Sequence, residues 1–313
     1  MNLRRAITTR RDRGVALITA MLISAIATMV AANLAWDNTL DVRRTLVNLG
    51  RDQAVQVALG AESWVISILR QDGGDNATDH LGEVWASELP GLPIEGGEVF
   101  GNIEDLQGRF NVNNLVDEDG QVVEKSLEQF RRLLNALGLD PRYASLTADW
   151  IDSNFDASFP DGAEDAIYTS RLPPYRTANQ TLSSVSELAA IEGMDRATFR
   201  ILEPHIVALP GRTAINVNTA TPAVLQSLSE NLTTGDVESL IKARESGGFV
   251  DMEGSFSALV TPEVLQELSE SSRFFRLKVI VRIDTVRITL YSVLQRVANT
   301  GTVTPILRSL GTT

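Results

Sequence analysis

An uncharged segment near the N-terminus limits most strongly what this chain can fold into. Residues 15–36 contain no Asp, Glu, Lys or Arg. As an α-helix, a segment of about 22 residues extends about 33 Å, which matches the hydrocarbon thickness of a lipid bilayer. The charged residues ahead of it are mostly basic, and positive charge stays on the cytoplasmic side of a membrane: Arg4, Arg5, Arg10, Arg11 and Arg13, against the single acid Asp12. The segment therefore predicts one membrane span with a cytoplasmic N-terminus and an exported remainder.

Gly14 separates the basic leader, residues 1–14, from the apolar segment. An ordinary secretory signal carries a small-residue cleavage site after its apolar run, and none is evident around residues 31–37. Cleavage after Gly14 would remove only the leader and leave a mature chain that begins at Val15. This order resembles a type IV prepilin signal, which implies a prepilin peptidase that cuts between Gly14 and Val15 and an N-methylated Val15. The alternative is a plain signal anchor.

The fifth residue of the mature chain, counted from Val15, restricts which pilin-like proteins this chain resembles. Most pilin-like proteins carry Glu there, and a carboxylate at that depth in lipid needs a cationic partner. This chain has Thr19 instead, so it does not need the N-terminal amine of a neighbouring subunit. Among pilin-like proteins, the missing Glu is typical of the large minor pseudopilin K of type II secretion (GspK-like), which is placed at the filament tip.

A helical pattern continues beyond the membrane span, residues 15–36. Over residues 37–70 apolar side chains recur at helical spacing, which predicts an amphipathic continuation of the same helix: Ala54, Ala58, Ala61, Val65 and Ile68. We expect this helix to end near Leu69, because Gly73 and Gly74 follow. Residues 72–98, rich in Gly, Pro and acidic residues, predict a loop with one helical turn near Trp85.

Two pairs of alternating segments predict strands. Residues 99–106 and 109–115 flank a glycine-containing turn and predict a small hairpin. Residues 274–283 and 286–297 flank a two-residue turn and predict a second hairpin. We expect both in one sheet, so that residues 71–124 and 257–313 form a pilin-like α+β head. Its basic side chains are expected on the polar face, where they would be available to an acidic partner subunit: Arg276, Lys278, Arg282 and Arg287.

Residues 125–256 change to short helices with clear start signals. Ser184 begins a capping box, and Thr221 is followed by Pro at the first helical position. Two segments that begin with Thr-Pro, residues 221–230 and 261–270, agree at eight of ten positions. Two helix starts with the same cap chemistry and a true duplication both account for this repeat.

Two features, one in this helical block and one ahead of it, resemble known patterns. Residues 214–222, a helix and residues 241–249 have the order of a helix-hairpin-helix module, which often binds nucleic acid. Its connection, residues 231–236, has no Lys or Arg, which disfavours phosphate binding. Residues 108–115 fit the Gly-Arg-Phe-Asn-x-Asn-Asn-Leu phrase of pseudopilin K. The resemblance implies an α+β fold in which a pilin-like antiparallel sheet carries an inserted all-helical domain (helix-hairpin-helix/SAM-like), residues 125–256.

An acidic stretch within this block is a candidate metal site. Residues 149–165 contain six carboxylates, which repel one another unless they are solvated, protonated or bridged by a cation. Oxygen ligands without His or Cys favour calcium. Asp152, Asn154 and Asp156 match the first three ligand positions of an EF-hand calcium loop. The rest of that loop does not match, because Ala157 replaces its Gly and Glu164 comes one residue late. The resemblance implies calcium in this domain, and a solvated acidic loop is the alternative. The candidate ligands are Asp152, Asn154, Asp156, Asp161, Glu164 and Asp165.

Composition restricts the function classes. The net charge is −12, and without residues 1–14 it is −16, a charge that nucleic acid and anionic headgroups repel. The chain has no Cys, so neither disulfides nor thiol chemistry are available. The sequence contains no nucleophile-elbow or phosphate-loop motif, and an enzyme is not expected.

Three function classes remain. The resemblance implies a minor pseudopilin at the tip of the type II secretion pseudopilus, which initiates or caps the filament and supports protein export across the outer membrane. It implies an inner-membrane anchor, a periplasmic head, and partnership with I- and J-type minor pseudopilins, without nucleic acid. The alternatives are a membrane-anchored, competence-type nucleic-acid binding protein and a membrane-anchored binding protein for exported substrates.

Overall fold

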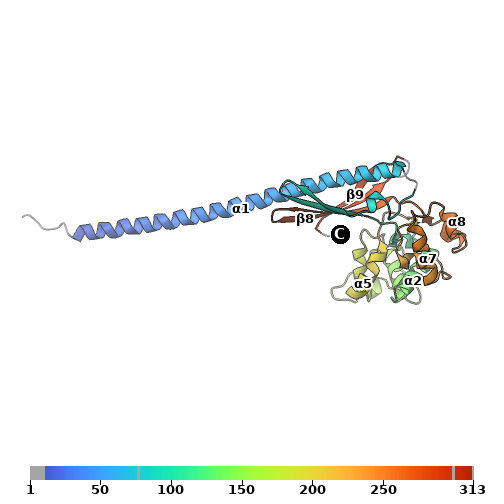
Figure 1. The fold of residues 1–313 in the computed structure, drawn as a ribbon. Helices are drawn as coiled ribbons and strands as arrows, with labels where there is room; N and C mark the ends of the chain where they lie inside the picture. Colours follow the sequence, from blue (N-terminus) through green and yellow to red (C-terminus); the bar gives the residue numbers. More distant parts are fainter. Residues whose placement is uncertain (1–10, 76–77, 298–299, 312–313) are drawn as a thin grey trace, which may run out of the picture.

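A single long helix projects far beyond the rest of the molecule in the computed structural model, which describes residues 11–75, 78–297 and 300–311 (Figure 1). Helix α1 spans Arg11–Asp75 without interruption. The predicted end near Leu69 was wrong, since Gly73 and Gly74 lie inside the helix. A Cβ added at Gly73 would come within 2.8 Å of the Arg296 side chain. Glycine there allows close packing of that side chain and does not end the helix.

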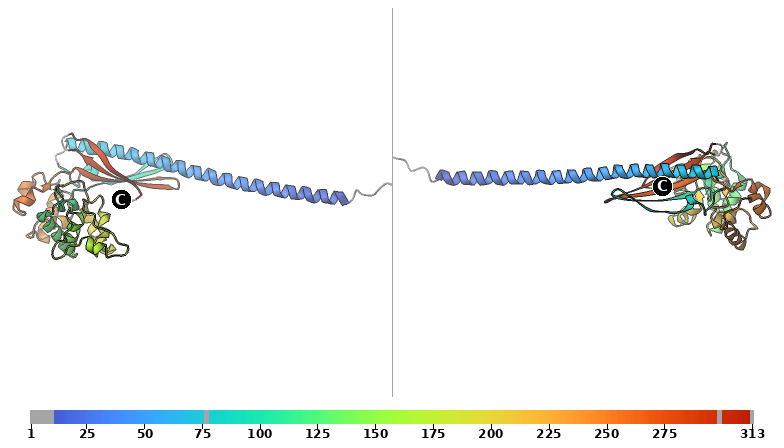
Figure 2. Two further views of the ribbon diagram at one scale, coloured as in Figure 1. Left: turned by 180° about the vertical axis from the view of Figure 1, so that it is seen from behind. Right: turned by 45° about the horizontal axis from the view of Figure 1, so that its top comes forward.

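Five antiparallel strands form a sheet against the second half of α1, in the order β1-β2-β7-β8-β9 (Figure 2). Alternate residues of β7 face the helix and are buried, as the two-residue period of a strand requires. Ala54 and Ala58 of α1 are fully buried against this face, because their small side chains allow the helix to approach the sheet. The strands are β1 (Leu89–Ile94), β2 (Gly97–Asp105), β7 (Phe274–Ile283), β8 (Val286–Arg296) and β9 (Val303–Leu310).

The sheet confirms one predicted hairpin and contradicts the other. β7 and β8 form the C-terminal hairpin. The hairpin predicted from residues 99–106 and 109–115 was wrong, because β2 pairs with β1 and β7. The second segment leaves the sheet, and its β3 (Phe110–Asn111) pairs in parallel with β4 (Ile206–Val207). Strand β1 was not predicted, because it contains two prolines. Prolines are tolerated in this strand because it lies at the edge of the sheet.

Between β2 and β7 the chain leaves the sheet and forms a group of short helices, the insert (residues 106–273), beside the C-terminal end of α1 (Figure 1). Asp105 and Phe275 are paired in the sheet, so the insert starts and ends on adjacent strands. It has a hydrophobic core separate from the one under α1. Its longer helices are α2 (Glu124–Ala136), α3 (Arg142–Ile151), α5 (Arg196–Leu202), α6 (Pro222–Ser227) and α7 (Thr234–Arg244).

Shorter elements complete the chain. The helical turn predicted near Trp85 is confirmed as η1 (Val84–Ala86). The others are η2 (Val112–Leu115), α4 (Asp165–Tyr168), η3 (Val185–Ala190), η4 (Glu203–His205), β5 (Ile215–Asn216), α8 (Met252–Phe256), α9 (Pro262–Leu265) and β6 (Leu268–Ser269).

Two predicted helix starts are confirmed by their hydrogen bonds. Ser184 forms a capping box with Glu187, although the element that follows, η3, is a 3-10 helix. Thr221 accepts a hydrogen bond from the backbone N–H of Val224 at the start of α6. Thr261 accepts no such backbone bond at the start of α9, so the two Thr-Pro segments share a helix start and differ in how it is capped.

The phrase at residues 108–115 fixes the entry of the chain into the insert. Phe110 stacks on Phe130 with ring centroids 5.1 Å apart. The amide of Asn113 donates to the carbonyls of residues 182 and 209 and accepts from the N–H of residue 182. Asn111 and Asn114 bind backbone groups of residues 209–213 in the same way. These buried amides replace the ladder hydrogen bonds that a regular sheet would supply.

The architecture confirms the predicted fold class, an α+β fold with a long N-terminal helix, an antiparallel sheet and helices placed between its strands. The domain limits expected from the sequence, at residues 14, 36, 70, 124 and 256, stay predictions.

Candidate functional sites

The segment predicted to span a membrane is the part of α1 that stays exposed along its length among the described residues. Within Gly14–Gly74 the most apolar window has a mean hydropathy of 2.3 and no buried residue, and the helix is long enough to cross a membrane. The Thr19 hydroxyl donates to backbone carbonyls of residues 15 and 16, so this polar group is satisfied within its own helix. The segment is compatible with a single-pass membrane anchor.

The proposed cleavage position lies at the start of this helix. Gly14 and Val15 are both exposed, and an added Cβ at Gly14 would meet nothing within 4 Å. Cleavage between them stays a prediction. Arg4, Arg5 and Arg10 of the leader lie outside the described residues.

Three carboxylates of the acidic stretch are buried together at the end of α3. Asp149 and Asp152 have no exposed area, and Glu164 is 4% exposed. One oxygen of each has no hydrogen-bond partner within the described part of the chain: Asp149 Oδ1, Asp152 Oδ1 and Glu164 Oε1. The buried carbonyl oxygen of the Asn179 side chain, Oδ1, is unpartnered as well. Unpaired buried oxygens are costly, and carboxylate and amide oxygens are the ligands that a hard cation such as calcium prefers.

The pKa shifts of these three carboxylates also favour a bound cation. Burial, followed by repulsion from Asp149 and Glu164, raises the pKa of Asp152 from 3.8 to about 7. Burial also raises the pKa of Asp149 and of Glu164. The surrounding loop is closely packed, since a Cβ added at Gly162 would lie 2.1 Å from Asp149 Oδ2. A cation would remove the repulsion that opposes ionisation of these groups.

The other predicted ligands lie at the edge of this cluster. Asp156 and Asp161 are exposed. The Asn154 amide donates to Asp152 Oδ2 and accepts from the N–H of residue 156, so its side chain is already engaged. Asp165 accepts from the backbone and hydroxyl of Thr177. Of the six predicted ligands, Asp152 and Glu164 are therefore the two with a buried oxygen that has no partner among the described residues.

The prediction missed Asp149 and Asn179 as ligand candidates. Asp149 lies in the last turn of α3, and Asp152, three residues later, is the residue that directly follows the helix. This closeness in sequence was the available signal. Asn179 lies far along the chain, with its backbone N–H donated to the carbonyl of Trp150. Its left-handed φ of 45° fixes an unusual backbone there, which the sequence alone does not reveal.

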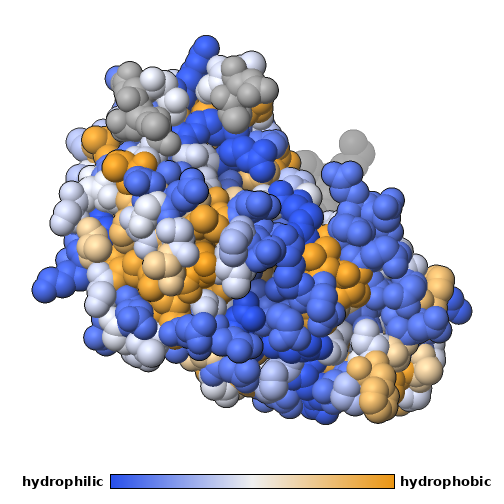
Figure 3. Space-filling view, turned by 90° about the vertical axis from the view of Figure 1, so that its right-hand side faces the viewer, coloured by the Kyte–Doolittle hydropathy of each residue, from blue (hydrophilic) through white to orange (hydrophobic). Residues whose placement is uncertain are grey.

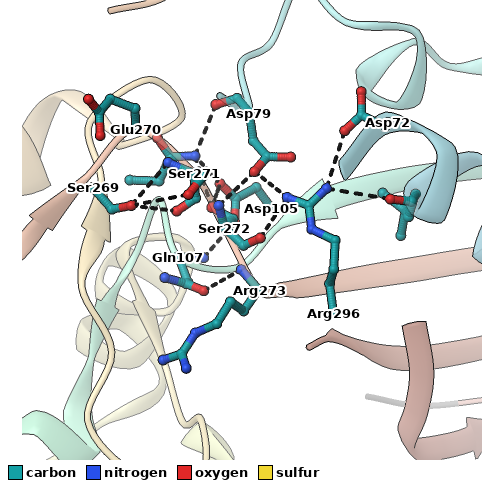
Figure 4. Close-up of polar contacts among 12 residues, drawn as sticks. Asp72, Asp79, Asp105, Gln107, Ser269, Glu270, Ser271, Ser272, Arg273 and Arg296 are labelled. Atoms are coloured by element: carbon teal, nitrogen blue, oxygen red, sulfur yellow. Dashed lines mark hydrogen bonds and ion pairs between the residues drawn. The ribbon is translucent and has the colours of Figure 1, made fainter. Parts of the chain in front are cut away.

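A second acidic group lies where α1, the sheet and the insert meet (Figure 4). Asp72, Asp79 and Glu83 offer oxygens within 4.8 Å of one another. The cation at this position is Arg296 of β8, which donates to Asp79 and forms an ion pair with Asp72 at 3.3 Å. Burial raises the pKa of Asp79, and the Arg296 charge opposes that rise. The Arg296 guanidinium therefore links α1, the sheet and the insert at this acidic group, which has a structural role.

The connection between α6 and α7 offers little to a phosphate backbone. Helix α7 begins with a capping box in which Thr233 and Asp236 satisfy each other. This capping places a carboxylate at the helix N-terminus, where phosphate would otherwise bind.

The long exposed apolar helix, the antiparallel sheet on its second half and the helical insert define a pilin-like subunit whose helix is long and apolar enough to anchor it in a membrane. Models of the family "Type II secretion system (T2SS), protein K" match residues 108–211 and 215–267. The chain belongs to the type II secretion system protein K family.

Individual relatives agree along nearly the whole chain. The type II secretion system protein K of Pseudomonas aeruginosa is 35% identical over 316 residues, covering 96% of this chain and 94% of that protein. The protein K of Klebsiella pneumoniae is 34% identical over 82% of this chain and 81% of its own. A chain in the crystal structure of the GspK-GspI-GspJ complex from enterotoxigenic Escherichia coli has the same fold, with a TM-score of 0.75 at 24% identity, covering 86% of this chain and all of that one.

These comparisons confirm the predicted family and the role of a minor pseudopilin in type II secretion, a structural component of a secretion machine. They give no support to the nucleic-acid binding alternative.

Proposed function

We propose that this subunit occupies the tip of the pseudopilus, where it initiates or caps the filament and supports protein export across the outer membrane. The observation that carries the proposal is the position of the insert beside the C-terminal end of α1 (Figure 1). In a filament of closely packed parallel helices, a bulky group at that end occupies the space of the next subunit. It is accommodated only where no further subunit follows.

The exported part faces an aqueous compartment. The end of the molecule seen in Figure 3 is mostly hydrophilic, with separate apolar patches. Together with the basic leader, this supports an inner-membrane anchor with a periplasmic head. The function proposed here involves no catalysis.

The proposed partners are I- and J-type minor pseudopilins, since the structural relative was solved as a GspK-GspI-GspJ complex. Co-expression of the full chain with such partners, followed by affinity purification in detergent, is expected to yield a stable complex. A chain that purifies alone under these conditions would contradict the proposal.

Processing of the N-terminus is tested by mass spectrometry of the purified chain. We expect the mature protein to begin at Val15 with one added methyl group. Gly14→Leu should keep the leader, whereas Thr19→Ala, deeper in the helix, should be processed normally. An intact Met1 in the wild type, or a start beyond residue 35, would refute prepilin processing.

We further propose that the buried oxygens of Asp149, Asp152, Glu164 and Asn179 bind a calcium ion. Support comes from their burial, from their lack of hydrogen-bond partners and from the raised pKa of all three acids. Calcium would connect the end of α3 to the loop at residues 162–165, in a domain that has no disulfides. Its binding free energy would add directly to the stability of the insert.

A further inference from the structure

The acidic group around Asp79 carries more negative charge than Arg296 balances. Asp72, Asp79 and Glu83 are nearly buried, with side chains 12%, 1% and 7% exposed. Among the described residues, the ion pairs of these carboxylates lead to Arg296 and to His80, which is charged only when protonated. Three carboxylates and one guanidinium leave two negative charges, and one divalent cation would neutralise them.

One carboxylate oxygen of Asp79 is buried without a partner. Oδ2 accepts from Arg296 and from the N–H of Ser272, whereas Oδ1 has no hydrogen-bond partner within the part of the chain that the structure describes. In Figure 4 this second oxygen lies on the side of the carboxylate toward Asp72. A buried oxygen without a partner is costly. A cation between Asp79 and Asp72 would satisfy it.

The three carboxylates lie close enough together to share one ion. Asp72, Asp79 and Glu83 each offer an oxygen within 4.8 Å of the other two. Two oxygens bound to one calcium ion lie at most about 5 Å apart, because each calcium–oxygen distance is about 2.3–2.6 Å. Magnesium requires shorter distances and a regular octahedron, whereas calcium accepts irregular arrangements of oxygen ligands. These separations therefore favour calcium.

Two of the three carboxylates are positioned by contacts that involve no ion. The backbone of Asp79 is fixed to the insert, since its N–H donates to the carbonyl of residue 270 and its carbonyl accepts from Asn216. Glu83 Oε2 accepts from the indole N–H of Trp85 and from the backbone N–H of residue 80. Hydrogen bonds of this kind orient carboxylate ligands toward a metal ion.

We propose that Asp72, Asp79 and Glu83 bind one calcium ion where α1, the sheet and the insert meet. The ion neutralises the charge that Arg296 leaves, and it ties the last turn of α1 to the loop that leads into η1. The neighbouring Asp105 is not a ligand, because hydrogen bonds already occupy both of its oxygens. The site shares no residue with the acids at the end of α3, and it binds its ion whether or not the subunit caps a filament.

The test is the luminescence of Tb³⁺, an ion that occupies the oxygen sites of calcium. The full-length chain in detergent carries Asp152→Asn, which disables the calcium site proposed at the end of α3. Because the indole of Trp85 contacts Glu83, excitation of tryptophan should give Tb³⁺ emission that added Ca²⁺ displaces. At saturating Tb³⁺, Trp85→Phe should lose most of this emission.

Variants in the same background identify the ligands. Glu83→Gln and Asp72→Asn remove one ligand charge each from two different elements, and each should weaken Ca²⁺ binding at least about tenfold. Glu88→Gln, at an exposed position a few residues further along, should change the affinity less than about twofold. Near-ultraviolet circular dichroism in chelator shows whether each variant keeps the wild-type fold.

Three results would each overturn the proposal. The first is emission that Ca²⁺ does not displace, or no emission, in the Asp152→Asn chain, including the case in which the wild type does emit, since the ion would then belong to the acids at the end of α3. The second is full emission from Trp85→Phe. The third is an unchanged Ca²⁺ affinity in folded Glu83→Gln and Asp72→Asn.

Discussion

The buried acids at the end of α3 link stability to pH and to calcium in a way that can be measured. The pKa of Asp152 rises from 3.8 to about 7 on folding. One pKa unit corresponds to about 1.4 kcal/mol, so ionising this buried carboxyl costs the folded state up to about 4 kcal/mol. A raised folded pKa means that the unfolded chain loses its proton first. Stability is therefore highest below pH 4 with respect to this group and falls as the pH rises to about 7.

The expected result in chelator is a thermal midpoint of the head that falls between pH 5 and pH 8. Between these two pH values the loss is about 2.5 kcal/mol, which for a domain of this size lowers the midpoint by about 7 °C. Calcium should reverse the trend, because the ion binds the ionised carboxylates and its stabilising effect grows as they lose their protons. Near-ultraviolet circular dichroism of the full chain in detergent follows the unfolding of the head at each pH.

Variants isolate the group responsible. Asp152→Asn removes one of the three buried acids with a raised pKa, so it should reduce the pH dependence in chelator and remove the response to calcium at this site. Asp156→Asn, at an exposed position of the same loop, should behave like the wild type. If chelator and calcium give the same midpoint at both pH values, the metal site is refuted. If Asp152→Asn keeps the pH dependence, Asp152 is not its source.

Three further changes test the joints of the fold, each by denaturant unfolding of the full chain. Arg296→Met removes the cation from the acidic group around Asp79, which is 1% exposed, and should cost about 3–5 kcal/mol; an unchanged midpoint would show that the joint adds no stability. Asn113→Ala leaves buried backbone groups of the insert unpaired and should cost about 2 kcal/mol or more, whereas Asn231→Ala, in the connection after α6, should cost little. Glu62→Gln weakens a bidentate pair with a half-exposed arginine of β9 and should cost about 1 kcal/mol; a loss above that of Arg296→Met would contradict this ranking.

Patterns along the chain were sufficient where local chemistry determines the structure. The uncharged run of residues 15–36 predicted the anchor, and the strict alternation of residues 274–283 predicted β7. The same patterns failed where contacts between residues far apart in the sequence determine the structure. Gly73 lies inside a helix, where Arg296 packs closely against it. Strand β1 tolerates its prolines because, within the described residues, it is the edge strand of the sheet and pairs with β2 alone.

The acidic stretch was recognisable as a candidate site, but its ligands were not. The sequence shows which residues carry oxygen atoms, whereas burial decides which of those atoms need a cation. Asp149 lies inside a helix and Asn179 arrives from a separate segment, so neither belongs to a local loop motif. Asp156 and Asp161 matched that loop better and yet are exposed to solvent.

The way the insert is attached has a consequence for engineering. Since β2 ends and β7 begins side by side, the pilin-like part is topologically complete without residues 106–273. A tight turn between the two strand ends would close the sheet as an ordinary hairpin. The same two strand ends would also accept a foreign domain whose termini lie close together, so the same helix and sheet could carry different inserted domains.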